Sequence, residues 1–358
     1  MRYLFRALLG VFLLGVLWLV ISPTGHYLLK AAKAEAGILA RRRSITEMIA
    51  DRSTPPAIAA KLRVVLAARA FAVDSVKLVA RQSFTTYSHL DRDTLVLVLS
   101  GAYRDRLEPY TWWFPIVGRV PYKGFFDFAL ARESEQQLAA KGFDVYLRPS
   151  PAFSTLGWFN DPVLSTSLRA DSIDIANTVI HELTHNTFYA SGQAVFNESF
   201  ANFVGARGSA WFFRMRGDSA SADEADARWS DDKLMARFWD GLYREMDSAF
   251  KAHPGEDNQR ARLTARDSIY ARARTELVQV LGPQLRTIGP YALEHTRLDN
   301  AALLAHRIYL TDVDLFDQVW DREHGSLPQA VSRIIALARS KPHDPFGALR
   351  AWLRQPAP

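Results

Sequence analysis

Two histidines and a glutamate within five residues could bind a metal ion and use it in catalysis. The segment reads His181-Glu182-Leu183-Thr184-His185. Residues four apart share a face of a helix, so both imidazole rings can reach one cation, and zinc is commonly held by imidazole nitrogen. Zinc lowers the pKa of the water that it polarises, and Glu182 is placed to take the proton from that water. The segment therefore predicts a hydrolytic zinc site with His181 and His185 as ligands.

The third ligand is expected from a carboxylate farther along the chain. A catalytic zinc ion needs three protein ligands and one open position. Glu198 follows His185 by thirteen residues, and a turn over residues 190–193 would let a second helix return past the first. We predict that Glu198 completes the ligand set. Asn202 lies one helical turn later and could hydrogen-bond to a ligand.

Each of these residues also has an ordinary structural interpretation. His181 and His185 could be hydrogen-bonded histidines of the core. Glu198 could be an exposed glutamate near a helix N-terminus, where the helix dipole favours a negative charge. Asn202 could be a polar surface residue. The apolar stretch before His181 predicts a buried helix over about 174–189, and the combination with Glu198 favours a metal site.

The remaining sequence predicts the elements that position these residues. We expect a mostly helical α+β fold with a small sheet before the metal-binding helix. Strands are expected at 94–99, 144–147 and 153–159. The second metal-binding helix should span about 197–204 and end at Gly205 and Gly208. Further expectations are helices at 27–50, 57–79, 128–140, 298–310 and 328–340, a packed loop at 109–128 and a charged helical arm at 214–280.

The N-terminus carries an apolar run over residues 7–21, preceded by Arg2 and Arg6. Together with the residues before it, this run approaches the roughly 20 residues that cross a bilayer as a helix. We expect residues 1–26 to form an uncleaved membrane anchor and residues 27–358 to form one domain. A cleaved signal peptide and a buried helix are the alternatives. The short tail before the run and the large domain after it favour a single-pass protein with its domain outside the membrane-bounded interior.

Composition narrows the classes of partner and of chemistry. Of the 358 residues, 48% are hydrophobic and 23% are charged, so the chain can bury a sizeable core. The net charge of +6 is spread along the chain and its longest basic run is Arg41, Arg42 and Arg43, so we expect no nucleic-acid partner. The absence of cysteine excludes disulfides, a cysteine nucleophile and thiolate metal ligands.

Several segments beyond the metal-binding motif carry a family resemblance. An HExxH motif followed by a glutamate on the next helix resembles the gluzincin metallopeptidases. A wider set of segments resembles the bacterial predicted aminopeptidase family with an HExxH centre, over most of residues 27–213 and more faintly over 298–340. The set comprises residues 27–38, 68–72, 114–118, 122–125, 153–159 with Asp161 and Pro162, 181–185 and 196–201.

The resemblance implies a zincin-like domain and a zinc aminopeptidase of the bacterial envelope that acts on peptides. With the N-terminal apolar run, it leads us to expect a single-pass protein of the inner membrane with its domain in the periplasm. It implies His181, His185 and Glu198 as metal ligands and Glu182 as the catalyst. Members of the family often begin with a lipid-modified cysteine, and this chain has the apolar run in its place. In thermolysin-like gluzincins, the position of Asn202 is commonly an aspartate.

Residues outside the motif predict how a peptide would be held. Residues 154–159 could offer an extended edge to the substrate backbone, with Trp158 and Phe159 either lining a side-chain pocket or packing in the core. Asp161 could bind the substrate ammonium group or cap the turn before Pro162. Candidates for stabilising the developing oxyanion are Tyr309, His295 and His306.

Two other functions compete with the aminopeptidase interpretation. An endopeptidase of the same chemistry would cut envelope proteins, and a blocked substrate N-terminus would not stop it. A non-enzymatic, membrane-tethered scaffold would keep a peptidase fold for binding alone. Glu182 beside an intact set of ligands argues against the scaffold.

Overall fold

The computed structural model describes residues 20–114, 118–150 and 162–356, together with residues 3–6, 9–10 and 17. It is a mostly helical α+β fold with small sheets, as predicted. Its helices are α2 (Pro23–Ala40), α3 (Ile45–Ala50), α4 (Pro56–Asp74), α5 (Phe128–Ala140), α6 (Ser172–Thr187), α7 (Ala194–Met215), α8 (Ser219–Lys251), α9 (Gln259–Thr275), α10 (Pro290–Glu294), α11 (Asn300–Tyr309), α12 (Val313–Arg322), α13 (Leu327–Ser340) and α14 (Pro345–Leu353). Its strands are β1 (Arg43–Ser44), β2 (Thr86–Ser88), β3 (Val96–Ala102), β4 (Trp112–Phe114), β5 (Gly118–Val120), β6 (Tyr122–Phe125), β7 (Asp144–Ser150) and β8 (Val163–Leu164).

The central sheet has the strand order β6-β3-β7, and β3 is antiparallel to both neighbours. Its register places Leu99 of β3 opposite Lys123 of β6 and Leu147 of β7. In a smaller sheet, β2 pairs antiparallel with β1 and parallel with β8, and β4 and β5 form a hairpin. The central sheet precedes α6 in the chain, as the predicted strands at 94–99 and 144–147 required.

Two expectations for the first half of the chain are wrong in detail. Residues 27–50 do not form one helix, because α2 ends at Ala40 and residues 43–44 are extended and pair with β2. Residues 109–128 are not a packed loop, because their aromatic-rich stretches form β4, β5 and β6 and satisfy their backbone groups by pairing. The strand predicted at 153–159 lies outside the described residues.

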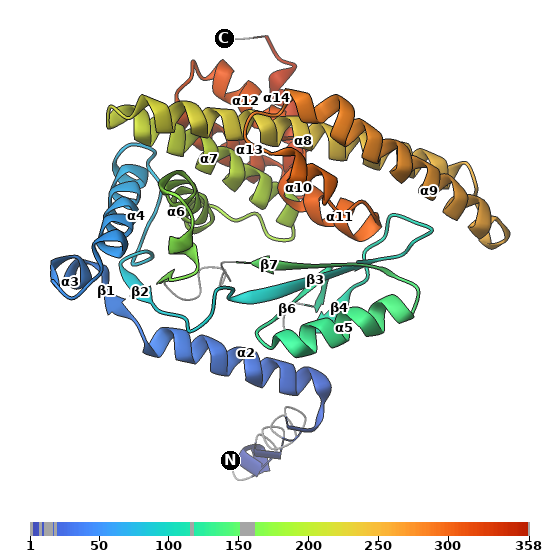
Figure 1. Cartoon of the computed structure of the whole chain (residues 1–358), viewed down its shortest axis with the longest axis horizontal. Helices are drawn as coiled ribbons and strands as arrows, with labels where there is room; N and C mark the ends of the chain where they lie inside the picture. The colour runs from blue at the N-terminus through green and yellow to red at the C-terminus, as the bar shows by residue number, and fades with distance from the viewer. Residues whose placement is uncertain are drawn as a thin grey trace.

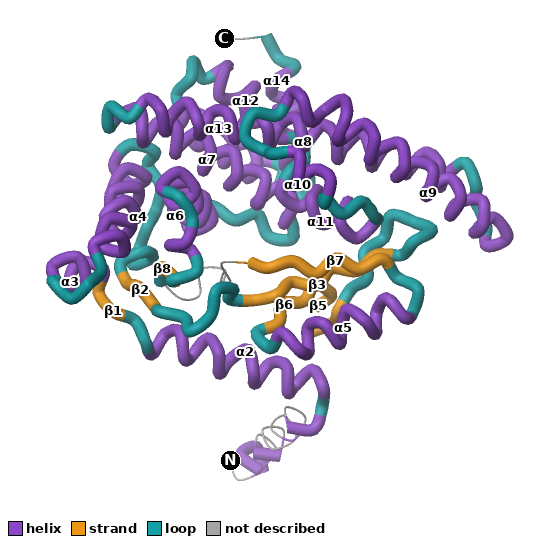
Figure 2. Tube along the Cα trace, in the orientation of Figure 1, coloured by secondary structure: helices purple, strands orange, loops and turns teal. Residues whose placement is uncertain are grey.

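The elements are arranged in layers (Figure 1). Helices α7, α8 and α12–α14 stack at the top of the view, the central sheet lies below them, and α5 and α2 lie beneath the sheet. Helix α11 packs on α7 on one side and on β3 and β7 on the other, so it joins the helical layer to the sheet. Figure 2 shows that the strands are confined to the lower half of the molecule, whereas the upper half is helical.

The largest core lies around α7, which is buried along most of its length. Phe316 of α12 contacts a column of three phenylalanines on α7, with ring centroids 5.7–5.8 Å apart. Each fully buried phenylalanine stabilises the fold by about 1.5–3 kcal/mol, so this column holds α12 firmly on α7. The three α7 residues are Phe196, Phe200 and Phe203.

The predicted charged arm at 214–280 is helical. Its first two residues end α7, and the rest forms the 33-residue α8, then α9, and a π-helical turn (Glu276–Leu281). The apolar positions spaced by four along α8 are buried against α9 and that turn in a second core, and they include Phe238, Leu242, Met246 and Phe250. Two charged residues of these helices, Asp231 of α8 and Arg266 of α9, are buried as well.

The N-terminal region yields one finding on membrane crossing. Among the residues that the structure describes, no helix combines the length and the apolar character that crossing a bilayer requires. The apolar run at 7–21 lies largely outside those residues. Helix α2 follows it, capped by the Ser22 side chain, which accepts a hydrogen bond from the backbone nitrogen of Gly25 at 2.8 Å.

Candidate metal centre

Helix α6 carries the HExxH segment close to its C-terminal end. The Asp171 side chain caps its N-terminus by accepting a hydrogen bond from the backbone nitrogen of Asp174 at 2.9 Å. The apolar face of α6 is buried in the main core, as the preceding sequence predicted, and it includes Ile175, Ala176, Val179, Ile180 and Leu183. His181 and His185 share the adjacent face and are only partly buried. Residues four apart on one helix therefore present two rings to the same point.

Helix α7 runs back past α6 and brings Glu198 close to His181 and His185. Residues 188–193 connect the two helices, and the Asn197 side chain fixes this connection. Its carbonyl oxygen accepts a hydrogen bond from the backbone nitrogen of Ala190 at 2.9 Å, and its amide nitrogen donates to the Ala190 carbonyl at 2.8 Å. Asn197 directly precedes Glu198. This buried, hydrogen-bonded amide therefore fixes the backbone from which the Glu198 side chain extends. This role of Asn197 has no signal in the local sequence, because it depends on how the connection folds back on α7.

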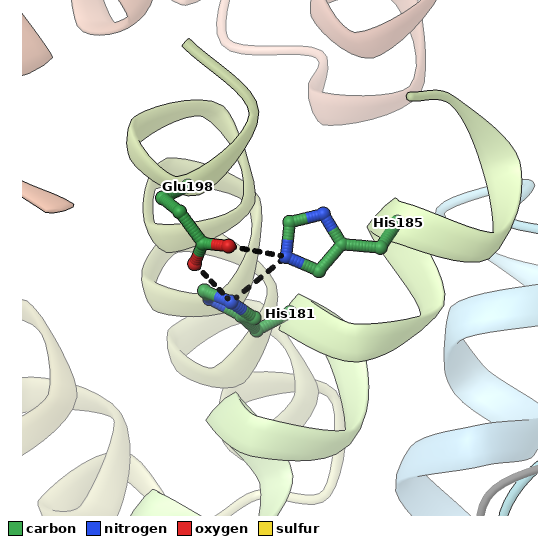
Figure 3. A group of neighbouring side chains, drawn as sticks. All are labelled: His181, His185 and Glu198. Atoms are coloured by element: carbon green, nitrogen blue, oxygen red, sulfur yellow. Dashed lines mark hydrogen bonds and ion pairs between the residues drawn. The ribbon is translucent and has the colours of Figure 1, made fainter. Parts of the chain in front are cut away.

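The two rings and the carboxylate converge (Figure 3). The Nε2 atoms of His181 and His185 lie 3.2 Å apart. Glu198 places Oε2 at 3.5 Å from Nε2 of His181 and Oε1 at 3.6 Å from Nε2 of His185. The three residues form the one group of this kind, among the described residues, whose donor atoms could hold a metal ion.

The donor spacing fits a tetrahedral metal site. Ligand atoms about 2.0–2.2 Å from a common zinc ion lie about 3.3–3.6 Å from one another at tetrahedral angles. The two Nε2 atoms, 3.2 Å apart, and the distances of 3.5 and 3.6 Å from them to different oxygens of Glu198 are close to these values, and one donor atom from each residue lies within 4.8 Å of the other two. Two neutral imidazoles and one carboxylate are also a donor set that zinc accepts.

The Glu198 carboxylate and the two histidine rings stabilise each other's charged forms. Burial tends to raise the pKa of Glu198, but the hydrogen bonds and positive charge of His181 and His185 lower it to about 2. Burial tends to lower the pKa of His181, but the hydrogen bond to Glu198 and the charges of Glu182 and Glu198 raise it. The carboxylate is therefore ionised at neutral pH, which is the form that binds a cation.

Glu182 and Asn202 lie next to this group. Glu182 follows His181 on α6, is partly exposed, and its negative charge acts on His181. Asn202 lies one turn after Glu198, and its amide nitrogen donates a hydrogen bond to the backbone oxygen of Tyr309 at 2.8 Å. Its side chain also raises the pKa of His181. Asn202 therefore links the two helices of the site to the end of α11.

Tyr309 lies on the sheet side of the same group. Burial raises the pKa of its hydroxyl, the charge of Glu198 raises it further, and the positive charge of Arg148 opposes both. Nη2 of Arg148 donates a hydrogen bond to the Tyr309 hydroxyl at 3.4 Å. Burial, followed by the influence of Tyr309, Glu198 and Tyr189, raises the pKa of Tyr122 to about 12. The charge of Glu198 thus acts on Tyr309 and Tyr122, and the Tyr189 ring lies beside His185, with ring centroids 6.5 Å apart.

The other residues predicted to bind the substrate or the oxyanion differ in where the structure places them. His306 stacks on Trp239 with ring centroids 4.4 Å apart, and burial, followed by the charge of Arg148, lowers its pKa to about 4. His295 is exposed and stacks on Tyr291 beyond α10, so the structure does not bring it to the metal centre. Trp158, Phe159 and Asp161 lie outside the described residues.

Gly205 and Gly208 do not end α7, contrary to expectation, because the helix continues to Met215. They let α7 approach α6 closely instead. A Cβ atom on Gly205 would lie 2.4 Å from Asn177 Oδ1, 3.0 Å from the Asn177 carbonyl and 3.2 Å from the His181 Cβ atom. One on Gly208 would lie 2.9 Å from a methyl group of Ile180. The close approach outweighs the usual cost of about 1 kcal/mol for glycine within a helix.

Replacing Gly205 with alanine should therefore separate α6 from α7, the two helices that carry the candidate metal ligands. Because the Asn177 backbone and the His181 Cβ atom cannot rotate away, we expect a loss of about 1–3 kcal/mol in stability and weaker metal binding. Thermal unfolding and metal titration would measure both. Gly241→Ala is the matched control, since a Cβ atom there meets nothing within 4 Å and alanine favours the helix. Unchanged stability and metal affinity in Gly205→Ala would contradict this account.

Comparison with known proteins adds one match. A family model described as "Putative aminopeptidase" matches residues 26–348. No curated protein and no solved structure matches the chain. The matched region contains the candidate metal centre, the central sheet and most of the helices around them. Because the match covers most of the chain, the protein belongs to this aminopeptidase family, and its membership implies peptidase activity.

Proposed function

We propose that the protein is a zinc-dependent aminopeptidase with a gluzincin-like site in a zincin-like domain. His181, His185 and Glu198 would hold the metal, and Glu182 would be the general base. The observation that carries this proposal is the convergence of the two imidazole nitrogens, 3.2 Å apart, on the Glu198 carboxylate, whose oxygens lie 3.5 and 3.6 Å from them. Such a group suits the donor set of a zinc ion. Family membership supports the reaction class.

A zinc ion bound there would act as a Lewis acid, polarising the scissile carbonyl and making a water more acidic. Glu182 would accept the proton from that water and pass it to the leaving amine. The Tyr309 phenol stays protonated at neutral pH because its pKa is raised. Since its oxygen accepts a hydrogen bond from Arg148, its own proton is free to be donated to the developing oxyanion.

Strand β7 is the best described candidate for the substrate edge. It pairs with β3 on one side and, among the described residues, with no strand on the other. An extended peptide could add to that edge through its backbone. The strand expected for this role at 153–159 follows β7 directly in the chain.

The test of this proposal is metal removal followed by restoration. The purified chain should contain about one zinc ion per molecule, lose cleavage of aminoacyl anilides after chelation, and regain it with zinc. An N-acetylated substrate should not be cleaved. Equal cleavage of free and acetylated substrates would favour the endopeptidase alternative, and full activity in the metal-free protein would refute the zinc mechanism.

We further propose that the N-terminal run anchors the protein in the inner membrane with the domain in the periplasm. Apolar residues of this run that the structure describes are exposed: Leu17 by 54%, Val20 by 54% and Ile21 by 67%. Transfer of such apolar side chains from water into lipid is favourable in free energy. The chain should stay in the membrane pellet after an alkaline carbonate wash, and protease added to spheroplasts should digest its domain. Release by the wash or protection from the protease would count against this location.

A further inference from the structure

The side chains of β7 alternate between the two faces of the central sheet, as in any strand. Those of Asp144, Tyr146 and Arg148 face α11, whereas Val145 and Leu147 pack with the apolar residues near α5. Three contacts connect β7 to α11, and they are spread from the first residue of the helix to the last. They are Asp144 Oδ2 with the backbone nitrogen of Asn300 at 3.0 Å, the Tyr146 ring with the His306 ring at 5.7 Å, and Arg148 Nη2 with the Tyr309 hydroxyl at 3.4 Å.

Arg148 therefore lies where β7, α11 and α7 meet. Tyr309, its partner, ends α11, and the Tyr309 carbonyl accepts the hydrogen bond from Asn202 on α7. Asn202 follows Glu198 by one helical turn. A short series of contacts thus joins the Arg148 guanidinium to the metal centre.

The positive charge of Arg148 is not neutralised by the described part of the chain. Its contacts there are the Tyr309 hydroxyl and the face of the same ring, 5.4 Å from the guanidinium carbon, and no described carboxylate forms an ion pair with it. Arg307, also on α11, instead reaches Asp240 at 3.3 Å. A partly buried guanidinium that meets no carboxylate among the described residues has donors that a ligand could use, and its planar fork suits a carboxylate in particular.

We propose that Arg148 binds a carboxylate of the substrate and so directs the enzyme toward short peptides that carry one near the scissile bond. This inference rests on the proposed peptidase function and adds a substrate class to it. The carboxylate could be the C-terminus of a di- or tripeptide or an acidic side chain. Both sources offer the same two oxygens to the guanidinium.

Binding of dipeptides to the Glu182→Gln protein tests this inference without turnover. Calorimetry would compare Ala-Ala with Ala-Ala-amide, and Ala-Asp-amide with Ala-Asn-amide. At least one carboxylate should bind about tenfold or more tightly than its neutral counterpart. A difference in the first pair identifies the C-terminus as the source, and a difference in the second pair identifies the side chain.

The Arg148→Gln change, made in the same background, should bring the affected ratio to about one. Arg119→Gln is the matched control, because it removes the same charge from an exposed position on β5 and should leave the ratio as it was. No carboxylate preference in either pair would overturn the inference, as would an equal loss for both members of a pair, which would mean that Arg148 only positions Tyr309. If the wild-type chain cleaves no peptide but the preference depends on Arg148, the inference stands and the aminopeptidase function fails.

Discussion

Replacing Glu182 with glutamine should lower kcat/KM for aminoacyl substrates by about 10²–10⁴-fold, the usual contribution of a general base. Glutamine keeps the size and the hydrogen-bonding reach of glutamate, but it cannot accept a proton. Glu182 is not one of the three converging residues, so the bound zinc should remain. Steady-state kinetics and elemental analysis of the same preparation would measure both quantities.

Two comparison variants make this result specific. Glu198→Gln should lose zinc together with activity, because it removes an ionised ligand. Asp174→Asn, on the same helix and paired with Arg228 at the surface, should change neither. If Glu182→Gln cleaves at the wild-type rate, the assigned mechanism is wrong.

The second large effect is expected on stability. Asp317 of α12 is buried and accepts hydrogen bonds from Arg207 Nε at 2.9 Å, Lys233 Nζ at 2.6 Å and the Trp229 indole nitrogen at 3.1 Å. Asp317→Ala would leave the largely buried Lys233 ammonium and the Trp229 indole nitrogen without this partner, and Arg207 with Asp226 at 3.6 Å as its remaining ion pair. We expect a loss of about 3–5 kcal/mol in the free energy of unfolding. Denaturant unfolding of the full chain in detergent, followed by tryptophan fluorescence, would measure it.

A neighbouring aspartate on α12 provides the control. Asp314 pairs with Arg237 of α8, but both side chains are exposed, by 42% and 59%. Asp314→Ala should therefore cost no more than about 1 kcal/mol. Adding Lys233→Met to Asp317→Ala should recover part of the loss, because it removes the charge left without this partner. Equal effects of the two aspartate variants would show that burial does not set the strength of the Asp317 cluster.

The sequence predicted the local geometry of the candidate site well. The spacing of His181 and His185 depends only on helical periodicity, and the apolar stretch before them predicted the buried face of α6. Bringing Glu198 to them required only one short turn. The strands at 94–99 and 144–147 and the helices on either side of them also follow from local patterns.

Features that depend on distant contacts could not be predicted in this way. Arg148 and Tyr309 are 161 residues apart in the chain, and their contact exists only because α11 packs across β7. The continuation of α7 through Gly205 conflicts with the intrinsic preference of glycine, and tertiary packing overrides that preference. The hairpin of β4 and β5 was mistaken for a loop because its strands are only three residues long.

The close approach of α7 to α6 has a consequence for finding relatives. A pentapeptide such as HExxH recurs by chance, whereas the geometry found here also fixes intervals beyond it. Twelve residues separate His185 from Glu198, six separate Glu198 from Gly205, and two separate Gly205 from Gly208. A search pattern that carries these intervals and demands the smallest residue at both last positions would encode the distance between the helices. Such a pattern should therefore discriminate this architecture from unrelated sequences far better than the pentapeptide does.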